Sequence, residues 1–570
     1  MRSQSYRGPI SEARIPFARM ELVLRNAKVI DGTGAPARHA DVGVEGGRIA
    51  AVGEVTANGA TEIDLDGLVL APGFVDIHTH YDAQVLWDRD LTPSCWHGVT
   101  SVVMGNCGFG IAPTRPEHRS TIARTLENVE GMSVDALEAG IPWTFESFPE
   151  YLDALESAPT RLNTAAMIGH TPLRLYVLGD EATERPAKDE EVDRMRDLVA
   201  EALQAGALGF ATSKSPTHAG AGGKPVPSRL AETDEVFRIA DALKDAGRGI
   251  MQITPGAGLF INEMAELSKR TGQRVSWTAL LTGIGGPGTA LQLLDATAKA
   301  GKDVWPQIAC RPLVMQLTFE DPFAFASAGA FKEVLQVPRE RRADIYADPG
   351  WRERARTAAD SGGVFATKWE KTTIAETERH RDLMGRSLAD IAAERGVTPM
   401  DAAIDLALDE DLKTRFRIVL ANDDEEEVGK LLQDERAVLG LSDAGAHASQ
   451  LCDACFSTHL LSHWVRDTGT LSLEQAVWRL TGQPARIFGI TDRGRIEEGL
   501  AADLVAFDPN TVGVDGELER VWDLPAGADR LIAKSTGVEH VWVNGTAIRT
   551  GGADVDDARP GKLLRAGRAD

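Results

Sequence analysis

The stretch GLVLAPGFVDIHTHYD at residues 67–82 constrains the fold of this chain more than any other part. Its second half, FVDIHTH at residues 74–80, is mostly apolar before two histidines, which predicts a buried β-strand entered through a Pro-Gly pair. Because side chains alternate between the faces of a strand, His78 and His80 point the same way. Two neighbouring imidazoles at a strand end form half of a metal site. The alternative is a pair of structural histidines satisfied by hydrogen bonds.

Strand-like apolar runs alternate with helical runs through most of the chain, which predicts βα units and a parallel sheet. Eight such units indicate an α/β fold with a (β/α)8 barrel, in which the chemistry lies at the carboxyl ends of the strands. The eight candidate strands span residues 74–80, 100–105, 163–169, 207–211, 249–254, 274–280, 303–309 and 437–442.

The two chain ends have a different texture, with short strands separated by tight turns. Such strands occur within residues 20–66 and again at residues 502–508 and 538–543. We expect both ends to form one small composite β-sandwich beside the barrel. The expected division is residues 1–19 as a disordered leader, residues 20–70 and 491–570 as the two parts of the sandwich, and residues 71–490 as the barrel.

The interval between the seventh and eighth strands is much longer than an ordinary βα connection. Residues 311–436 are aromatic and charged, with helical patches at residues 388–395 and 399–408. We expect an inserted subdomain there, which acts either as a lid over the active site or as scaffold.

Charge and cysteine content narrow the function classes. The 570 residues carry 61 basic and 85 acidic side chains, a net charge of −24, which argues against nucleic acid or an anionic membrane as partner. Five scattered cysteines are too few for a disulfide framework, so a reducing, cytoplasmic location is expected. No run of 18 apolar residues is present, so we expect no membrane span. The expected partner is a small-molecule substrate.

Four motifs carry a resemblance to a known family. PGFVDIHTHYDAQ at residues 72–84 resembles the first barrel strand of the amidohydrolase superfamily. Within it, the chain is similar to the N-acyl-D-amino-acid deacylase (D-aminoacylase) group from about residue 20 to near the C-terminus. The supporting motifs are GNCGFGIAP at 105–113, IGHTPLR at 168–174 and GLSDAGAH at 440–447. The resemblance implies a metal-dependent hydrolase of a carbon–nitrogen bond.

The metal ligands expected from residue type and from the resemblance are His78, His80, Cys107 and Asp443. Neutral imidazoles suit a borderline metal such as Zn²⁺. Small neighbours let the Cys107 thiolate approach a metal, and the resemblance implies that it is a ligand; the alternative is a buried, inert thiol. The resemblance gives Asp443 a second role, in which it takes a proton from water and passes it to the leaving nitrogen.

Other polar residues near the strand ends are candidates for substrate contact. His170 is expected to polarise the substrate carbonyl or help hold a metal; the alternative is a structural histidine. Arg174 is expected to pair either with a substrate carboxylate or with an internal acid. A lysine after strand four, Lys214, is the position of a carbamylated ligand in some amidohydrolases, but we expect no such role here. The remaining candidates are His218, Gln252, Arg311 and His447.

The chain departs from the family pattern in strands five and six. The resembling enzymes supply histidines there, whereas this chain has Gln252 in strand five and Trp277 or Thr278 in strand six. These are poor ligands for zinc, so we expect at most one metal, Zn²⁺ or another divalent ion. The lysine that binds the substrate carboxylate after strand six in the family is also missing, and Arg174, Arg229 and Arg311 are its candidate replacements.

The sequence therefore predicts an amidohydrolase that uses one divalent metal to hydrolyse a linear amide, with N-acyl-D-amino-acid deacylation as the implied reaction. One alternative is a hydrolase of a cyclic amide, urea or lactone on the same scaffold. Another is a barrel that has lost catalysis and acts as a binding protein, which the missing histidines favour. A homo-oligomer is expected by analogy with similar barrels.

Overall fold

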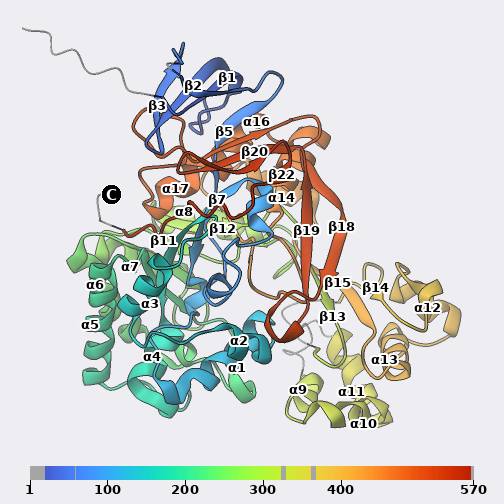
Figure 1. The fold of residues 1–570 in the computed structure, drawn as a ribbon. Helices are drawn as coiled ribbons and strands as arrows, with labels where there is room; N and C mark the ends of the chain where they lie inside the picture. Colours follow the sequence, from blue (N-terminus) through green and yellow to red (C-terminus); the bar gives the residue numbers. More distant parts are fainter. Residues whose placement is uncertain (1–19, 58, 323–328, 361–366, 567–570) are drawn as a thin grey trace, which may run out of the picture.

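The computed structural model describes residues 20–566, except for residue 58 and the segments 323–328 and 361–366. The expected leader, residues 1–19, lies outside the described residues. Within the described part of the chain, no helix is both long and apolar enough to cross a bilayer. Figure 1 shows a barrel body, a sheet at one end of it, and a separate helical lobe at its side.

The barrel is one eight-stranded parallel sheet in the order β6-β7-β8-β9-β10-β11-β12-β16. A parallel bridge between Thr79 and Ala444 brings the two edge segments together. All eight predicted strands are confirmed, and with them the (β/α)8 fold. The strands are β6 (Phe74–Asp76), β7 (Val99–Met104), β8 (Asn163–Gly169), β9 (Gly209–Ser213), β10 (Ile250–Thr254), β11 (Val275–Trp277), β12 (Val304–Ile308) and β16 (Val438–Leu439).

Amphipathic helices cover the outside of the barrel. In α5 (Asp189–Ala205), Val192, Met195 and Val199 recur at helical spacing and are buried, which places one apolar face against the strands. The helix ends at Gly206, whose φ of 113° is unfavourable for other residues. The other helices of this layer include α1 (Arg119–Glu130), α2 (Val134–Gly140), α3 (Phe148–Glu156), α4 (His170–Leu178), α6 (Thr233–Ala246), α7 (Ile261–Thr271), α8 (Thr289–Ala300), α14 (Glu425–Gln433), α15 (Phe456–His459), α16 (Leu473–Leu480) and α17 (Gly482–Phe488).

Strands from both chain ends share one nine-stranded sheet, in the order β22-β21-β20-β17-β5-β1-β2-β3 with β4 on β1. The two ends meet where β17 pairs antiparallel with β5, and Leu24, Leu504 and Trp542 lie together in its core. Strands of both ends therefore pair in one sheet, as expected, while the division of the chain into domains stays a prediction. The strands are β1 (Leu22–Val29), β2 (Arg38–Glu45), β3 (Arg48–Gly53), β4 (Thr61–Asp64), β5 (Val69–Pro72), β17 (Leu504–Phe507), β20 (Val538–Val543), β21 (Thr546–Thr550) and β22 (Ala553–Asp554).

The long interval after strand seven contains an antiparallel sheet of order β13-β15-β14, with a hydrophobic core of its own. Its core includes Tyr346, Trp351 and Phe416, which are almost fully buried. The boundaries of this unit as a domain stay a prediction. Its elements are β13 (Leu313–Leu317), α9 (Gly329–Leu335), α10 (Arg342–Ala347), α11 (Pro349–Asp360), β14 (Thr373–Glu376), α12 (Leu388–Arg395), α13 (Pro399–Asp409) and β15 (Arg415–Ala421).

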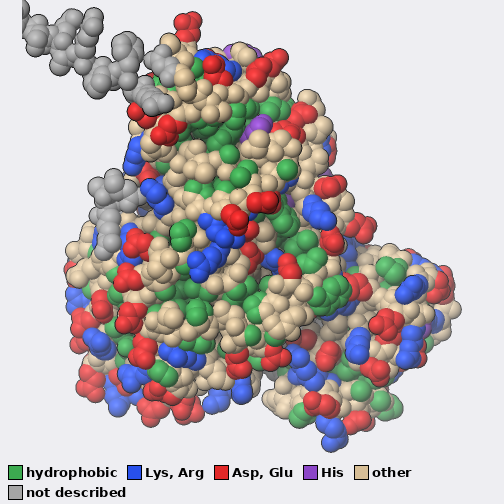
Figure 2. Space-filling view, viewed as in Figure 1, with side chains coloured by type: hydrophobic (Ala, Val, Ile, Leu, Met, Phe, Trp, Pro, Cys, Tyr) green, Lys and Arg blue, Asp and Glu red, His purple; other side chains and the backbone are tan. Residues whose placement is uncertain are grey.

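A long hairpin of β18 (Gly513–Val521) and β19 (Arg530–Thr536) reaches from the terminal sheet towards this lobe (Figure 1). Arg520 on the hairpin donates to Glu376 and Gln316 of the lobe at 2.7 and 2.8 Å, so the C-terminal part helps to hold the lobe in place. On the face seen in Figure 2, acidic and basic side chains are interspersed.

Candidate metal centre

His78 and His80 lie just beyond β6, where the backbone is held on both sides. Thr79 donates its N–H to Val103 on β7, and His80 donates to Ala444 beyond β16. The two imidazoles are buried, with 1% and 7% of each residue exposed, and their ring centroids lie 5.3 Å apart. The first barrel strand therefore presents both rings together, as its alternation predicts.

Cys107 reaches the same place from a tight turn after β7. Gly105 and Gly108 flank it with positive φ angles, and a side chain on Gly105 would collide with the Met167 carbonyl. The turn can therefore pack directly on the neighbouring strand. The Sγ atom of Cys107 lies 3.5 Å from Nε2 of His78, and donor atoms of Cys107, His78 and His80 all lie within 4.8 Å of one another.

Asp443 completes the cluster from the loop after β16. Its Oδ1 atom lies 3.2 Å from Nε2 of His78 and 3.9 Å from Nε2 of His80, and 26% of its side chain is exposed. Removal from bulk water raises the pKa of Asp443, with the nearby His447 acting in the opposite direction. The carboxylate faces both imidazoles and still has access to solvent.

The second nitrogen of each imidazole is occupied, which orients the ring. Nδ1 of His78 lies 2.6 Å from Oε1 of Gln307 on β12, and Nδ1 of His80 lies 3.3 Å from Oε1 of Glu130 at the end of α1. Acceptors at both Nδ1 atoms leave both Nε2 atoms facing Asp443, the arrangement that second-layer acceptors give to metal-binding histidines. Burial lowers the pKa of His78 to about 4, opposed by the Gln307 hydrogen bond, so the ring is neutral at neutral pH.

The donor set fits a divalent metal such as zinc. It offers two imidazole nitrogens, one sulfur and one carboxylate oxygen, the atom types that zinc binds in proteins. Burial raises the pKa of the Cys107 thiol well above its usual range, and the charges of Glu130 and Asp443 act in the same direction. A thiolate at this position therefore needs a cation beside it.

His218 and His447 line the same end of the barrel. Nδ1 of His218 lies 2.7 Å from the Ser213 hydroxyl, and its ring packs 5.0 Å from the ring of Phe109. Burial lowers the pKa of His80 well below its usual value, and the charges of His78, His447 and His218 add to this effect. Of the predicted substrate-contact residues, these two are the histidines that the structure brings beside the cluster.

His170 and Arg174 lie in a separate buried network. Nδ1 of His170 lies 2.8 Å from the Thr212 hydroxyl, and its Nε2 lies 2.9 Å from Glu235. Arg174, fully buried, also binds Glu235 and donates to the Arg185 carbonyl at 2.9 Å. Both ring nitrogens of His170 are engaged, so the geometry favours the structural alternative for His170 and the internal-acid alternative for Arg174.

The other candidates are held by internal partners. Arg311 donates from Nε to Asp453 at 2.7 Å, and Arg229 donates to the His218 carbonyl at 3.0 Å. Lys214 directs its ammonium group at the carbonyls of Arg229 and Ala231. Trp277 pairs in register with Ile253 and packs with it in the main core.

Gln252, in contrast, faces the site. It pairs in register with Ser276 on the next strand, and its Oε1 accepts a 2.6 Å hydrogen bond from the backbone N–H of Cys107. Two residues of this site were not predicted, Glu130 and Gln307. Gln307 left a signal, since it is a polar residue inside the apolar run VWPQI; Glu130 lies on a helix and left none.

The family model described as "Amidohydrolase family" matches residues 61–548. The chain belongs to the amidohydrolase family. D-aminoacylase of Alcaligenes xylosoxydans xylosoxydans is 31% identical over 535 residues, which cover 93% of this chain and 94% of that protein. N-acyl-D-glutamate deacylase of the same organism is 31% identical over 567 residues, which cover 96% of this chain and 97% of that protein.

Solved structures agree with the sequence relatives. A crystal structure of D-aminoacylase has a TM-score of 0.67 and 28% identity, and the match covers 96% of this chain and all of that chain. N-acyl-D-glutamate deacylase from Bordetella bronchiseptica, in complex with zinc and a phosphonate that mimics the tetrahedral intermediate, has a TM-score of 0.67 and 27% identity over the same shares. The resemblance of this amidohydrolase to the D-aminoacylase group is confirmed.

Proposed function

We propose that this amidohydrolase is a metal-dependent N-acyl-D-amino-acid deacylase, which converts an N-acyl-D-amino acid and water into a carboxylic acid and a free D-amino acid. The observation that carries the proposal is the convergence of His78, His80, Cys107 and Asp443 at the carboxyl end of the barrel. Three relatives that match nearly the whole chain are named as enzymes that act on this class of amide.

We assign the metal to these four residues and propose one zinc, or another divalent ion in its place. Bound there, the metal would polarise the scissile carbonyl and lower the pKa of the attacking water. The five cysteines of the chain are all buried free thiols, which supports a reducing compartment, and with it the cytoplasm, as the proposed location.

The chain's own residues divide the remaining work. Asp443 accepts the proton of the attacking water and returns it to the leaving nitrogen, so that the amide C–N bond breaks and the amine leaves neutral. Burial raises the pKa of Asp443, which makes the carboxylate a better proton acceptor in the first half of this transfer. Gln307 and Glu130 hold the two imidazoles in one orientation, so the ligand atoms need little reorganisation.

The test is the Asp443→Asn variant with N-acyl-D-amino acids, their L-enantiomers, and a hydantoin as the cyclic amide. Wild type should release a free D-amino acid, and Asp443→Asn should lose roughly a hundredfold to ten-thousandfold in kcat. Metal content should fall only partly, because three ligands remain. Full activity of Asp443→Asn would contradict the proposed role, and hydrolysis of the hydantoin alone would favour the cyclic-amide alternative.

A further inference from the structure

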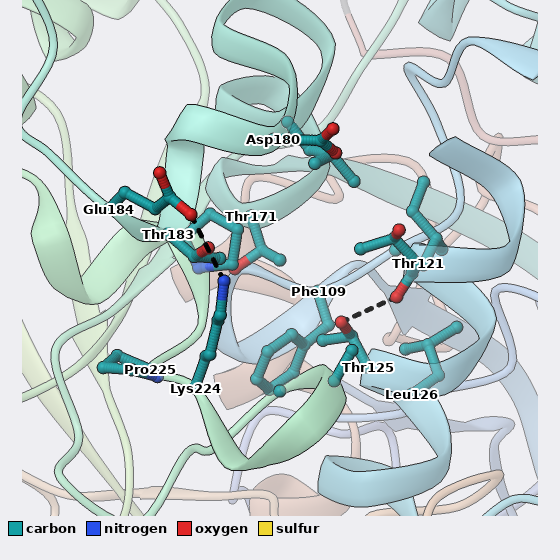
Figure 3. A pocket seen from close by; sticks show the side chains of 16 residues that line it. Phe109, Thr121, Thr125, Leu126, Thr171, Asp180, Thr183, Glu184, Lys224 and Pro225 are labelled. Carbon is teal, nitrogen blue, oxygen red and sulfur yellow. Dashed lines mark hydrogen bonds and ion pairs between the residues drawn. The ribbon is translucent and has the colours of Figure 1, made fainter. Parts of the chain in front are cut away.

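A cavity of about 390 Å³ lies at the carboxyl end of the barrel. Figure 3 shows the side chains that line it. Its walls come from the loops and helices that follow strands two, three and four: Phe109 and α1, α4, and the segment around Lys224. This is the end of a (β/α)8 barrel at which substrates bind, and the volume lies in the range of small-molecule sites.

The cavity and the metal centre share their walls. Phe109 and Gly110, two and three residues beyond Cys107, line both this cavity and the small cleft formed by His80 and Glu130. The ring of Phe109 also packs on His218, 5.0 Å away. A substrate with its amide at the metal centre can therefore extend past Phe109 into the cavity.

One side of the cavity wall is aliphatic. Ile122, Leu126 and Leu175 contribute aliphatic side chains. Two lining threonines already donate hydrogen bonds from their hydroxyl groups. Thr125 donates to the Thr121 carbonyl at 2.8 Å, and Thr171 donates to the Ser228 hydroxyl at 3.2 Å. The aliphatic side of the wall, with these two hydroxyl groups engaged, therefore favours contact with a hydrocarbon group.

The charges at the rim disfavour an anionic group. Among the described residues that line the cavity, Lys224 is the one cation, and its ammonium lies 3.3 Å from Glu184. Figure 3 shows this pair reaching across one side of the cavity, with Asp180 on another. The carboxylate of an N-acyl amino acid would meet two acidic residues and one paired lysine here. The acyl end of the substrate carries no charge.

We propose that this cavity binds the acyl group, and that the enzyme prefers aliphatic or arylalkyl acyl groups longer than acetyl. The inference rests on the proposed function and adds the class of substrate. Because burying one methylene is worth roughly fourfold in affinity, kcat/KM should rise about fourfold per added methylene from N-acetyl to N-hexanoyl-D-methionine, until the cavity is filled.

The experiment measures the ratio of kcat/KM for the hexanoyl and acetyl substrates in Thr121→Trp, which fills the cavity, and in Arg124→Trp. Arg124 is exposed on the same helix and serves as the matched control. The ratio should fall at least tenfold in Thr121→Trp and stay at the wild-type value in Arg124→Trp. A hexanoyl-to-acetyl ratio in Thr121→Trp equal to that of wild type overturns the proposal. So does a Thr121→Trp variant that instead changes the dependence of kcat/KM on the amino-acid side chain, measured from D-alanine to D-phenylalanine.

Binding separates this inference from the proposed function. Calorimetry of N-acetyl- and N-octanoyl-D-methionine with Asp443→Asn protein, with and without Thr121→Trp, requires no turnover. Chain-length-dependent affinity without hydrolysis by wild type would refute the deacylase function alone. Hydrolysis by wild type with no chain-length dependence would refute the cavity assignment alone.

A second, independent observation concerns the Gln252 amide. Gln252 is fully buried, and its Oε1 accepts the Cys107 N–H. Because a backbone N–H only donates, the atom it meets is the oxygen, and this fixes the position of the amide nitrogen. That Nε2 has no hydrogen-bond partner among the described residues. An unpaired buried donor is unfavourable unless a ligand supplies the acceptor.

We infer that Nε2 of Gln252 donates to the carbonyl oxygen of the scissile amide and holds it more tightly as negative charge develops there. Gln252 thereby acts as an oxyanion donor beside the metal centre. The inference rests on the proposed function, because the acceptor is the substrate of that reaction. Removal of one such donor typically costs roughly 10²–10³ in kcat.

The experiment uses Gln252→Glu, whose carboxylate retains the acceptor for Cys107 N–H but removes the donor, with Gln252→Met as a second variant. Expected are a loss of roughly a hundredfold or more in kcat, metal content equal to wild type, and a matching loss of affinity for a phosphonate substrate analogue. A loss of metal would assign Gln252 to the metal site instead. A kcat within threefold of wild type in both folded variants would refute the donor role.

Discussion

Oε1 of Gln307 lies 2.6 Å from Nδ1 of His78, and Nε2 of Gln307 donates to the Ser276 hydroxyl at 2.9 Å. The amide is therefore fixed at both ends, with its oxygen towards the imidazole. Strands six and seven thereby orient the imidazole of His78, the first of the proposed metal ligands. This contact gives the polar Gln307 a role inside an otherwise apolar strand.

Gln307→Leu is expected to lower metal affinity roughly 10- to 100-fold while the protein stays folded, because a second-layer acceptor of this kind is worth about that much. Gln307→Glu, which keeps an acceptor at the same place, should retain most of the affinity. The measurement is a competition titration with a chelating dye, alongside the melting temperature. Equal affinity in wild type and Gln307→Leu would show that the hydrogen bond does not support the metal.

Metal stoichiometry is the second prediction. Wild type purified without chelator should contain about one zinc per chain, and His78→Ala/His80→Ala should contain almost none, because the donor cluster found among the described residues is His78, His80 and Cys107. His39→Ala removes an exposed histidine and serves as the control. Elemental analysis gives the answer. Two metals per chain would mean that further donors take part, with His218 and His447 the first to test.

The third prediction concerns the buried Glu235 carboxylate. Although burial acts to raise it, the hydrogen bond and charge of His170 and the charge of Arg174 hold the pKa of Glu235 below its usual value. Arg174→Met leaves this carboxylate with His170 alone and should destabilise the protein by about 3–5 kcal/mol. Thermal unfolding of wild type and variant measures the loss.

The fourth prediction concerns His170, which belongs to the same buried network. We expect the ring to have a structural role. His170→Asn should then lower the melting temperature but leave kcat per folded molecule within about threefold of wild type. A loss of roughly a hundredfold or more at unchanged metal content would instead support the polarising role predicted from the sequence. Kinetics at a temperature below the variant's unfolding transition separate the two outcomes.

The sequence predicted the barrel and the two strand-one histidines because both depend on local pattern. Parallel strands covered on both faces appear in the sequence as continuous apolar runs, and each of the eight runs overlaps a strand. The alternation of a strand also determines that His78 and His80 share a face. These features need no knowledge of which segments meet in space.

Pairings between distant residues could not be predicted in this way. Arg174 and Glu235 are 61 positions apart, and a single sequence does not show that an arginine in a recognisable motif is already paired with an internal acid. Glu130 is equally hidden, because an acidic residue in the last turn of a helix usually faces solvent. The polar Gln307 within VWPQI was visible, but its partner was not.

The last prediction is a pH dependence of stability from His97, which joins the barrel to the C-terminal hairpin. Its Nε2 donates to the Ala533 carbonyl at 3.0 Å, and its Nδ1 lies 2.8 Å from the Thr458 hydroxyl. Burial lowers its pKa from 6.5 to about 4, against the Ala533 hydrogen bond, with the charges of Arg311 and Arg549 also lowering it.

Below pH 6.5 the unfolded chain takes up a proton at His97, whereas the folded chain does so only near pH 4. The neutral buried ring therefore costs the folded state about 3 kcal/mol of relative stability as the pH falls through this window. His97→Gln should flatten the fall in stability between pH 6.5 and 4 by that amount, whatever its effect at pH 8. Urea unfolding across this range, with the exposed His39→Gln as control, measures the slope. A slope that stays equal to wild type in His97→Gln would assign the acid sensitivity to other groups.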